Sequence, residues 1–176
     1  MEEVILVNEN DNVIGKAEKM EAHMTGKLHR AFSVFIFDRA GRLLMQKRAR
    51  TKYHSASLWS NTCCSHPRPE EATGAAARRR LREEMGIDCE LREVFAFTYL
   101  AELENDLVEH EIDHVFTGNF DGVPSPDARE IDDWKWIDVA TLLEDIRERP
   151  GQYSYWLKTS IDELLLNLTR ERRVRL

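Results

Sequence analysis

The feature that most constrains the fold is an almost unbroken apolar run at residues 32–37, because such a run is typical of a strand covered on both faces. Residues 42–46 follow across the turn-forming segment 38–41 and predict a second buried strand. Further strands are expected at residues 91–100, 109–120 and 134–137, and a hairpin at residues 4–8 and 13–17. A sheet of this size needs helices to cover its faces.

Three helices are expected. Residues 70–85 are rich in Ala and Arg, contain no proline and stop before Gly86, a natural C-terminal cap. Residues 139–148 predict a second helix, ended by Pro150-Gly151, and residues 153–168 a third, with Leu and Ile at helical spacing. The interleaving predicts an α/β (α+β) fold, a mixed β-sheet sandwiched between α-helices. The length of 176 residues fits a single domain.

Charge and cysteine content exclude several classes of protein. The formal net charge of −7 argues against a nucleic-acid partner, which needs a basic face. The first residues lack the pattern of a signal peptide, and no apolar run approaches the roughly 20 residues that span a bilayer. Three cysteines, two of them adjacent, favour a reducing compartment. We therefore expect a cytoplasmic protein that does not enter the membrane.

The most informative motif is the run Leu-Trp-Ser-Asn-Thr-Cys-Cys-Ser-His at residues 58–66, which places a thiol close to an imidazole. The helix expected next matches most of the Nudix box, with Glu71, Arg79, Glu83, Glu84 and Gly86. Carboxylates on one helical face can hold Mg²⁺, which often bridges to phosphates.

The match to the Nudix box fails at two positions. Ser65 stands where the box begins with Gly, and Arg80 replaces the Glu of its Arg-Glu pair. In Nudix hydrolases that Glu binds metal, whereas an arginine in its place suits a phosphate-facing group. Arg80 and Glu84 are four residues apart and are expected on one helical face. A helix with solvated ion pairs is the alternative interpretation.

Histidine and glutamate form another candidate set. Glu109 and Glu111 are two residues apart on an expected strand, so both carboxylates point to one face. Combined with histidines they would suit Zn²⁺, Mn²⁺ or Fe²⁺, with Mg²⁺ less favoured by the imidazoles. Spacing alone does not bring these residues together. The three candidate histidines, expected in loops or at strand edges, are His23, His29 and His66.

The chain resembles type I isopentenyl-diphosphate isomerases over about residues 4–160. The resemblance rests on five segments: His23, residues 27–33, residues 59–67, residues 109–111 and residues 153–156. It implies a Nudix fold with a core at about residues 30–150, in which the helix at about 153–168 closes the active site. It also implies the interconversion of isopentenyl and dimethylallyl diphosphate by protonation and deprotonation, a step of isoprenoid biosynthesis, carried out by a monomer.

The resemblance also implies a set of site residues. The ligands of a divalent metal (Mn²⁺, Zn²⁺ or Mg²⁺) are His23, His29, His66, Glu109 and Glu111. Glu84 and the carbonyl of Cys64 match the ligands of a Mg²⁺ ion that arrives with the substrate diphosphate. The expected diphosphate contacts are Lys19, Arg48, Lys52, Ser65 and Arg80.

Moving a double bond requires an acid and a base on opposite faces of the substrate, and a wall that tolerates a carbocation. We expect Glu111, with Tyr99 nearby, to protonate the terminal methylene; which of the two delivers the proton stays open. Cys64 would remove the allylic proton, and Trp156 would face the cation. Cys63 and Cys89 are expected to be packing residues.

Two other functions remain open at this point. One is a Nudix hydrolase of a nucleoside diphosphate derivative, against which Arg80 and Cys64 argue. The other is a binding module in which Cys63, Cys64 and His66 hold structural zinc. No second cysteine knuckle exists in the sequence to complete such a zinc site.

Overall fold

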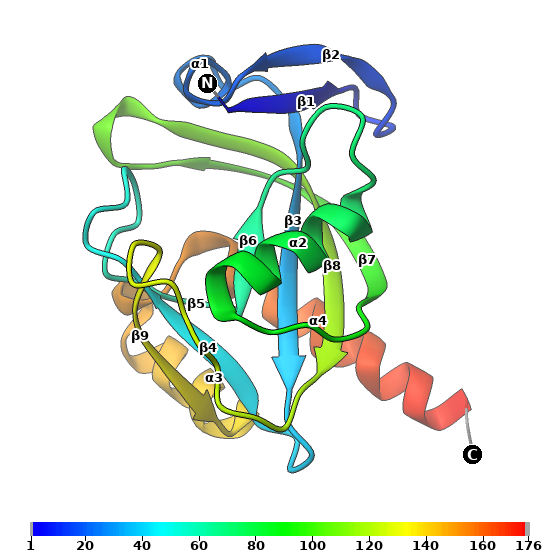
Figure 1. Cartoon of the computed structure of the whole chain (residues 1–176), viewed down its shortest axis with the longest axis vertical. Coiled ribbons are helices and arrows are strands. Elements are labelled where there is room, and N and C mark those ends of the chain that lie inside the picture. The colour runs from blue at the N-terminus through cyan, green and yellow to red at the C-terminus, as the bar shows by residue number, and fades with distance from the viewer. Residues whose placement is uncertain (1, 175–176) are drawn as a thin grey trace.

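The computed structural model describes residues 2–174, and the side chains of residues 2–170. Its centre is strand β3 (His29–Phe37), which pairs in parallel with β8 (Val108–Asn119) over nine register pairs, from His29 opposite Glu111 to Phe37 opposite Asn119. On its other edge β3 pairs antiparallel with β6 (Cys63–Ser65), with Ser33 opposite Cys64. The expected buried strand at residues 32–37 is therefore confirmed and is the axis of the sheet (Figure 1).

The remaining strands extend the mixed sheet on both sides of β3. An N-terminal hairpin of β1 (Glu3–Val7) and β2 (Val13–Glu18) joins it through Leu6 opposite His29. Strand β7 (Arg92–Glu102) pairs antiparallel with β8. Strand β4 (Leu43–Arg48) pairs with β5 (Trp59–Ser60) and with β9 (Ile131–Ile137).

Helices cover both faces of the sheet, as the sequence predicts (Figure 1). Helix α2 (Thr73–Met85) packs Ala77 and Leu81 onto the face of β3 that carries Val34 and Ile36. Phe35 points to the opposite face, where α3 (Val139–Glu148) and α4 (Tyr155–Val174) complete a second core. The alternation of side chains along one strand thus supplies both layers of the sandwich.

The structure differs from the sequence prediction at helix ends and short elements. Helix α2 begins three residues later than expected because Glu70 adopts a left-handed backbone conformation, with φ of 66°. It ends at Gly86 as predicted, with φ of 66° at the cap. Helix α4 begins at Tyr155 and runs six residues past the predicted end. Within the described chain, no helix is long and apolar enough to cross a membrane.

Five elements were not predicted: helix α1 (Lys19–Thr25), β5, β6 and the 3-10 helices η1 (Glu104–Asp106) and η2 (Pro150–Gln152). Each is too short for a hydrophobic period to be visible in the sequence. Two of them carry site residues, since α1 holds His23 and β6 holds Cys64. The expectation that His23 lies in a loop or at a strand edge was therefore wrong.

Candidate active site

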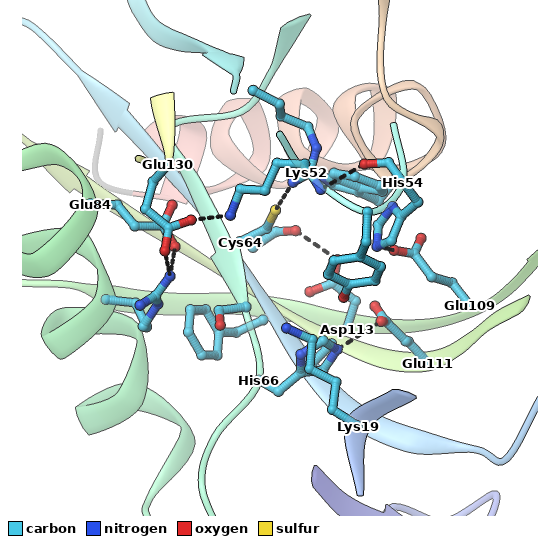
Figure 2. Close-up of a pocket in the computed structure, with 18 of the residues that line it drawn as sticks. Lys19, Lys52, His54, Cys64, His66, Glu84, Glu109, Glu111, Asp113 and Glu130 are labelled. Atoms are coloured by element: carbon cyan, nitrogen blue, oxygen red, sulfur yellow. Dashed lines mark hydrogen bonds and ion pairs between the residues drawn. The ribbon is translucent and has the colours of Figure 1, made fainter. Parts of the chain in front are cut away.

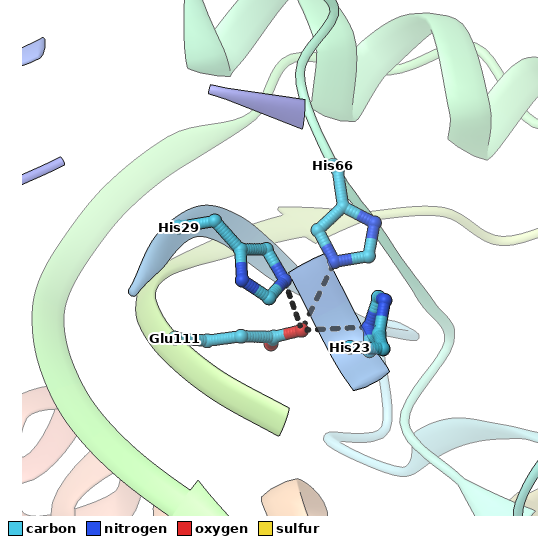
Figure 3. Close-up of side chains that lie close together, drawn as sticks. All are labelled: His23, His29, His66 and Glu111. Carbon is cyan, nitrogen blue, oxygen red and sulfur yellow. Dashed lines mark hydrogen bonds and ion pairs between the residues drawn. The ribbon is translucent and has the colours of Figure 1, made fainter. Parts of the chain in front are cut away.

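Four buried side chains from four parts of the chain meet beside the end of β3 (Figure 3). His29 begins β3 and lies directly across from Glu111 on β8. His23 comes from the last turn of α1, and His66 follows β6. The Nε2 atoms of His66, His29 and His23 lie 2.9, 3.3 and 3.8 Å from Oε1 of Glu111. Ligands of a single ion are separated by distances of this size when each bond is about 2.1 Å.

The hydrogen bonds of His23 and His29 suit a metal. Nδ1 of His23 donates to the carbonyl of Lys19, and Nδ1 of His29 to that of Lys27, each over 2.7 Å. A ring that donates through Nδ1 keeps a lone pair on Nε2, and metal-bound histidines show the same arrangement. The Nε2 atoms of both residues are buried without a hydrogen-bond partner. Burial also lowers the pKa of His66 to about 4, which keeps that imidazole neutral. The group could hold a divalent metal ion.

The structure does not bring Glu109 into this group, although Glu109 and Glu111 share a face of β8 as predicted. Oε1 of Glu109 instead lies 3.3 Å from Nε2 of His54. His23, His54 and Glu109 form a second possible metal group, which overlaps the first at His23. Burial, reinforced by the charge of Glu111, raises the pKa of Glu109 well above its usual range.

A pocket of about 140 Å³ lies beside the metal group (Figure 2). Tyr99 on β7 lies opposite Glu111 in the β7–β8 register and is buried. Its hydroxyl donates to Oε2 of Glu111 over 2.7 Å and lies 3.0 Å from Oε2 of Glu109. Burial and these two carboxylates raise the pKa of Tyr99 well above its usual value, so the phenol keeps its proton. A proton donor therefore lines one wall of the pocket.

The two adjacent cysteines point in different directions. Cys63 is fully buried in the core beneath α2. Cys64 is half-buried, lines the pocket and packs against Tyr99 and Trp156. Burial raises the pKa of the Cys64 thiol to about 12, which the neighbouring Arg48 opposes. Nη1 of Arg48 lies 3.9 Å from Sγ of Cys64.

Trp156, on α4, lines the pocket next to this thiol. It is 2% exposed, and its Nε1 donates to Oδ1 of Asn61 over 2.9 Å. Its ring centroid lies 5.1 Å from Cζ of Arg48. Arg48 is itself anchored, because its Nη2 donates to the carbonyl of His54 and its Nε to that of Ser55. Arg48, expected at the diphosphate, is therefore a fixed part of the wall between the thiol and the indole.

Cations and carboxylates alternate at another part of the pocket. Nη2 of Arg80 lies 2.5 Å from Oε1 of Glu84, four residues along α2 as predicted, and 3.3 Å from Oε1 of Glu130. Lys52 also pairs with Glu130 (Figure 2). Nε of Arg80 is buried without a hydrogen-bond partner. Burial raises the pKa of Glu84, although Arg80 and Lys52 oppose the shift.

The other expected diphosphate contacts also line this pocket. Nζ of Lys19 lies 5.0 Å from the ring centroid of Tyr53 and 3.0 Å from Oε2 of Glu2. Ser65 lines the same pocket. All five residues expected at the diphosphate therefore face one space, together with the expected catalytic residues.

Sequence reasoning missed five titratable residues that line the pocket, namely Glu2, Tyr53, His54, Asp113 and Glu130. All five lie outside the motifs, and no periodicity marks four of them. Asp113 could have been found, because it continues the alternation of Glu109 and Glu111 along β8. It accepts a hydrogen bond from Ser33 over 2.7 Å, and its Oδ1 is buried without a partner.

The structure gives no support to a zinc-binding module. Among the described residues, neither possible metal group contains a cysteine. Cys63 is buried on the α2 side of the sheet, away from His66, which pairs with Glu111. A knuckle of Cys63, Cys64 and His66 would require these side chains to meet.

Comparison with known proteins places the chain in a family. A model described as "NUDIX domain" matches residues 27–157. The chain is 61% identical over 164 residues to Isopentenyl-diphosphate Delta-isomerase 1 of Aromatoleum aromaticum, with 93% of each protein covered. It is 56% identical over 161 residues to the isopentenyl-diphosphate Delta-isomerase of Burkholderia multivorans, with 92% of each covered.

Solved structures agree on the fold. A protein of Deinococcus radiodurans superposes with a TM-score of 0.71 at 21% identity, covering 87% of this chain and 92% of that one. A NUDIX hydrolase from Nitrosomonas europaea gives a TM-score of 0.61 at 15% identity, covering 80% and 90%. At such identities the likeness concerns the fold alone.

Proposed function

Because the chain belongs to the isopentenyl-diphosphate Delta-isomerases and carries a Nudix domain, it interconverts isopentenyl and dimethylallyl diphosphate, and we propose the roles of its side chains in that reaction. The observation that carries the proposal is the shared pocket. A protonated phenol hydrogen-bonded to Glu111 and the thiol of Cys64 line the same space, with Trp156 beside them.

We propose that the Tyr99–Glu111 pair delivers the proton to the terminal methylene carbon. The alkene uses its π electrons to form the new C–H bond, and a tertiary cation develops at the neighbouring carbon. Tyr99 is the member of the pair that carries a proton in the resting site, since its pKa is raised and its hydroxyl donates to Glu111. Positioned acids of this kind contribute about 10²- to 10⁴-fold in rate.

Cys64 takes the allylic proton, and the electrons of that C–H bond form the new double bond. In the reverse direction the thiol returns the proton, and the Tyr99–Glu111 pair acts as the base. The guanidinium of Arg48, 3.9 Å from Sγ, favours the thiolate against the burial that raises its pKa. The ring of Trp156 stabilises the cation by about 0.5 to 2 kcal/mol.

We propose that His23, His29, His66 and Glu111, joined by Glu109, hold a divalent ion. Imidazole and carboxylate ligands suit Mn²⁺ or Zn²⁺ better than Mg²⁺. The free Nε2 lone pairs of His23 and His29 support this assignment. A bound ion would polarise the carboxylate of Glu111 and hold it, with Tyr99, in a fixed position.

For the diphosphate we propose the cationic part of the pocket. Lys52 and Arg80 are paired with Glu130 and Glu84, and the unpartnered Nε of Arg80 is free to donate to a phosphate oxygen. Lys19, Arg48 and Ser65 line the same pocket and complete the proposed set of contacts. Glu84 and the carbonyl of Cys64 would hold a Mg²⁺ ion carried in by the diphosphate.

We further propose that the chain acts as a monomer in the cytoplasm, and that α4 closes the active site over the core at about residues 30–150. The position of Trp156 at the first turn of α4, hydrogen-bonded to Asn61, supports a closing role for that helix. The odd number of cysteines, all free, supports a reducing compartment.

The test is incubation of the purified protein with isopentenyl diphosphate, Mn²⁺ and Mg²⁺ in deuterated water, followed by NMR. The proposal expects dimethylallyl diphosphate with deuterium in a methyl group, because the added proton comes from groups that exchange with solvent. The Nudix hydrolase alternative expects phosphate release from a nucleoside diphosphate derivative instead. Inertness toward both substrates would contradict the proposed reaction.

A further inference from the structure

His54 is a buried histidine of the pocket that has no part in the mechanism described above. It is 5% exposed and lies in the segment between β4 and β5. Its Nε2 lies 3.3 Å from Oε1 of Glu109, and its Nδ1 lies 3.3 Å from the hydroxyl of Ser55. In Figure 2 the imidazole of His54 points toward Glu109 across the pocket wall. Burying a polar imidazole costs free energy unless a polar group lies next to it, and the carboxylate of Glu109 is such a group.

The backbone around His54 is fixed from two sides. The guanidinium of Arg48 donates to the carbonyls of His54 and Ser55 over 3.2 and 3.1 Å. From the other side, the amide of Ser55 donates to Glu104 over 3.2 Å, and the side chain of Asn105 donates to the carbonyl of Tyr53 over 3.1 Å. The imidazole is therefore held in place by its own segment and does not depend on Glu109 for its position.

Glu109, in contrast, is held by its partners. Oε2 of Glu109 lies 3.0 Å from the hydroxyl oxygen of Tyr99, and Oε1 faces His54. In the absence of an ion, neither oxygen lies within 4.8 Å of all the ligand atoms of His23, His29, His66 and Glu111. The carboxylate thus lies at the edge of the proposed metal site, between that site and His54.

His23 decides how the two overlapping groups can be used. Its ligand atoms are within reach of both sets of residues. Its Nδ1 is committed to the carbonyl of Lys19, which leaves the single lone pair of Nε2. One lone pair binds one ion, so the two groups cannot each hold an ion through His23 at the same time. When His23 binds the ion together with His29, His66 and Glu111, His54 does not bind an ion through this group. Its contact with Glu109 remains.

We propose that His54 is a positioning residue of the metal centre, which anchors Glu109 beside the ion and thereby sets how tightly the ion is bound. The physical reason is that a ligand held by an outer hydrogen bond loses less freedom when the metal binds. Loss of such outer partners typically weakens metal affinity about 10- to 100-fold. The inference rests on the proposed metal site, which it deepens by adding a residue that does not touch the ion.

The experiment measures affinity for Mn²⁺ without substrate, by competition with a chromophoric chelator. His54→Ala removes the partner of Glu109 and should weaken binding about 10- to 100-fold. His54→Gln places an amide donor near the same position and should recover most of the affinity. His110→Ala is the matched control, because His110 lies between the two glutamates but points to the other face of β8. It should stay within about twofold of the unaltered protein, well below the effect of an outer partner.

Several outcomes separate the inference from the proposal on which it rests. If the unaltered protein binds no Mn²⁺, the proposed metal site is wrong. If it binds Mn²⁺ and His54→Ala binds equally well, only the positioning role of His54 is wrong. Two ions per chain in the unaltered protein and one in His54→Ala would make His54 a ligand, which also overturns the inference. Circular dichroism and thermal unfolding check that each variant is folded. If His54→Ala is not, folded His54→Phe takes its place, because it keeps a ring without a donor. Mn²⁺ affinity of His54→Phe within about twofold of His110→Ala would then overturn the inference.

Discussion

The hydroxyl of Tyr99 lies 2.7 Å from Oε2 of Glu111 and 3.0 Å from Oε2 of Glu109, so one phenol bridges two buried carboxylates. The hydroxyl donates to Glu111. Tyr99→Phe keeps the ring and removes the hydroxyl proton, and should lower kcat about 10²-fold with little change in KM. Tyr155→Phe is the control, because Tyr155 stacks near Tyr99 but is 40% exposed. Steady-state kinetics that show equal kcat for Tyr99→Phe and the unaltered enzyme would exclude Tyr99 from proton delivery.

The two adjacent thiols should behave differently. Cys64→Ala removes the proposed base from the pocket and should lower kcat about 10³-fold while the protein stays folded. Cys63→Ala removes a sulfur from the core beneath α2 and should cost about 1 kcal/mol of stability with most activity kept. Activity assays and denaturant unfolding of both variants check this. The reverse pattern would assign catalysis to Cys63.

Replacing Trp156 should affect the rate more than the affinity. Trp156→Phe weakens the attraction of the ring for a cation, worth about 0.5 to 2 kcal/mol, and should lower kcat about 2- to 30-fold. It also leaves Oδ1 of Asn61 without the indole donor, so some loss of thermal stability accompanies it. Trp136→Phe, on β9 and outside the pocket, should leave kcat unchanged. A stability loss in Trp156→Phe without any fall in kcat would make the indole a core residue only.

Arg80 should matter for substrate affinity. Arg80→Ala removes the unpartnered Nε that is available to the diphosphate and should raise KM about tenfold or more, because hydrogen bonds to charged groups are worth about 1.5 to 3 kcal/mol. Arg80→Lys should recover part of the loss. Arg79→Ala serves as control, since Arg79 pairs with Glu71 and Glu83 outside the pocket. Equal KM values for the Arg80 and Arg79 variants would contradict the assignment.

Metal binding should stabilise the fold through His66. Mn²⁺ at about 100 times its dissociation constant should add about 2.7 kcal/mol, which raises Tm by several degrees. Protein treated with a chelator to remove the ion should unfold at a lower temperature than the Mn²⁺-loaded protein and should lose activity. His66→Ala should abolish the shift, whereas His114→Ala, whose imidazole pairs with Asp11 and Glu93 at the surface, should keep it. A shift of the same size in His66→Ala would place the ion elsewhere.

Long periodic segments were predictable from sequence, and short ones were not. The apolar run of β3 predicts a buried strand and the leucine spacing of α4 predicts a helix, and the structure has both elements. Strand β6, with three residues, has no period, yet it sets Cys64 opposite Ser33 and sends Cys63 into the core. The site residues could be named from the sequence because they match motif positions of the isomerase family that the chain resembles.

What the sequence left open is how the site residues pair. The parallel register of β3 and β8 sets His29 opposite Glu111, and no spacing in the chain encodes a register between strands about 80 residues apart. For the same reason His54 could not be placed against Glu109, since only folding of the segment after β4 brings them within 3.3 Å. The position of Arg48 beside Cys64 was likewise not visible in the sequence, and its expected contact with the diphosphate stays a prediction.

In the proposed mechanism an acid and a thiol act from opposite sides of a five-carbon chain. This arrangement can be seen in a crystal structure with Mn²⁺, Mg²⁺ and saturated isopentyl diphosphate. We expect Sγ of Cys64 on one side of the chain and the oxygens of Tyr99 and Glu111 on the other, each within about 3.5 Å of the carbon to or from which it transfers a proton. A ligand that leaves Cys64 out of reach, or that has all three groups on one side, would contradict it.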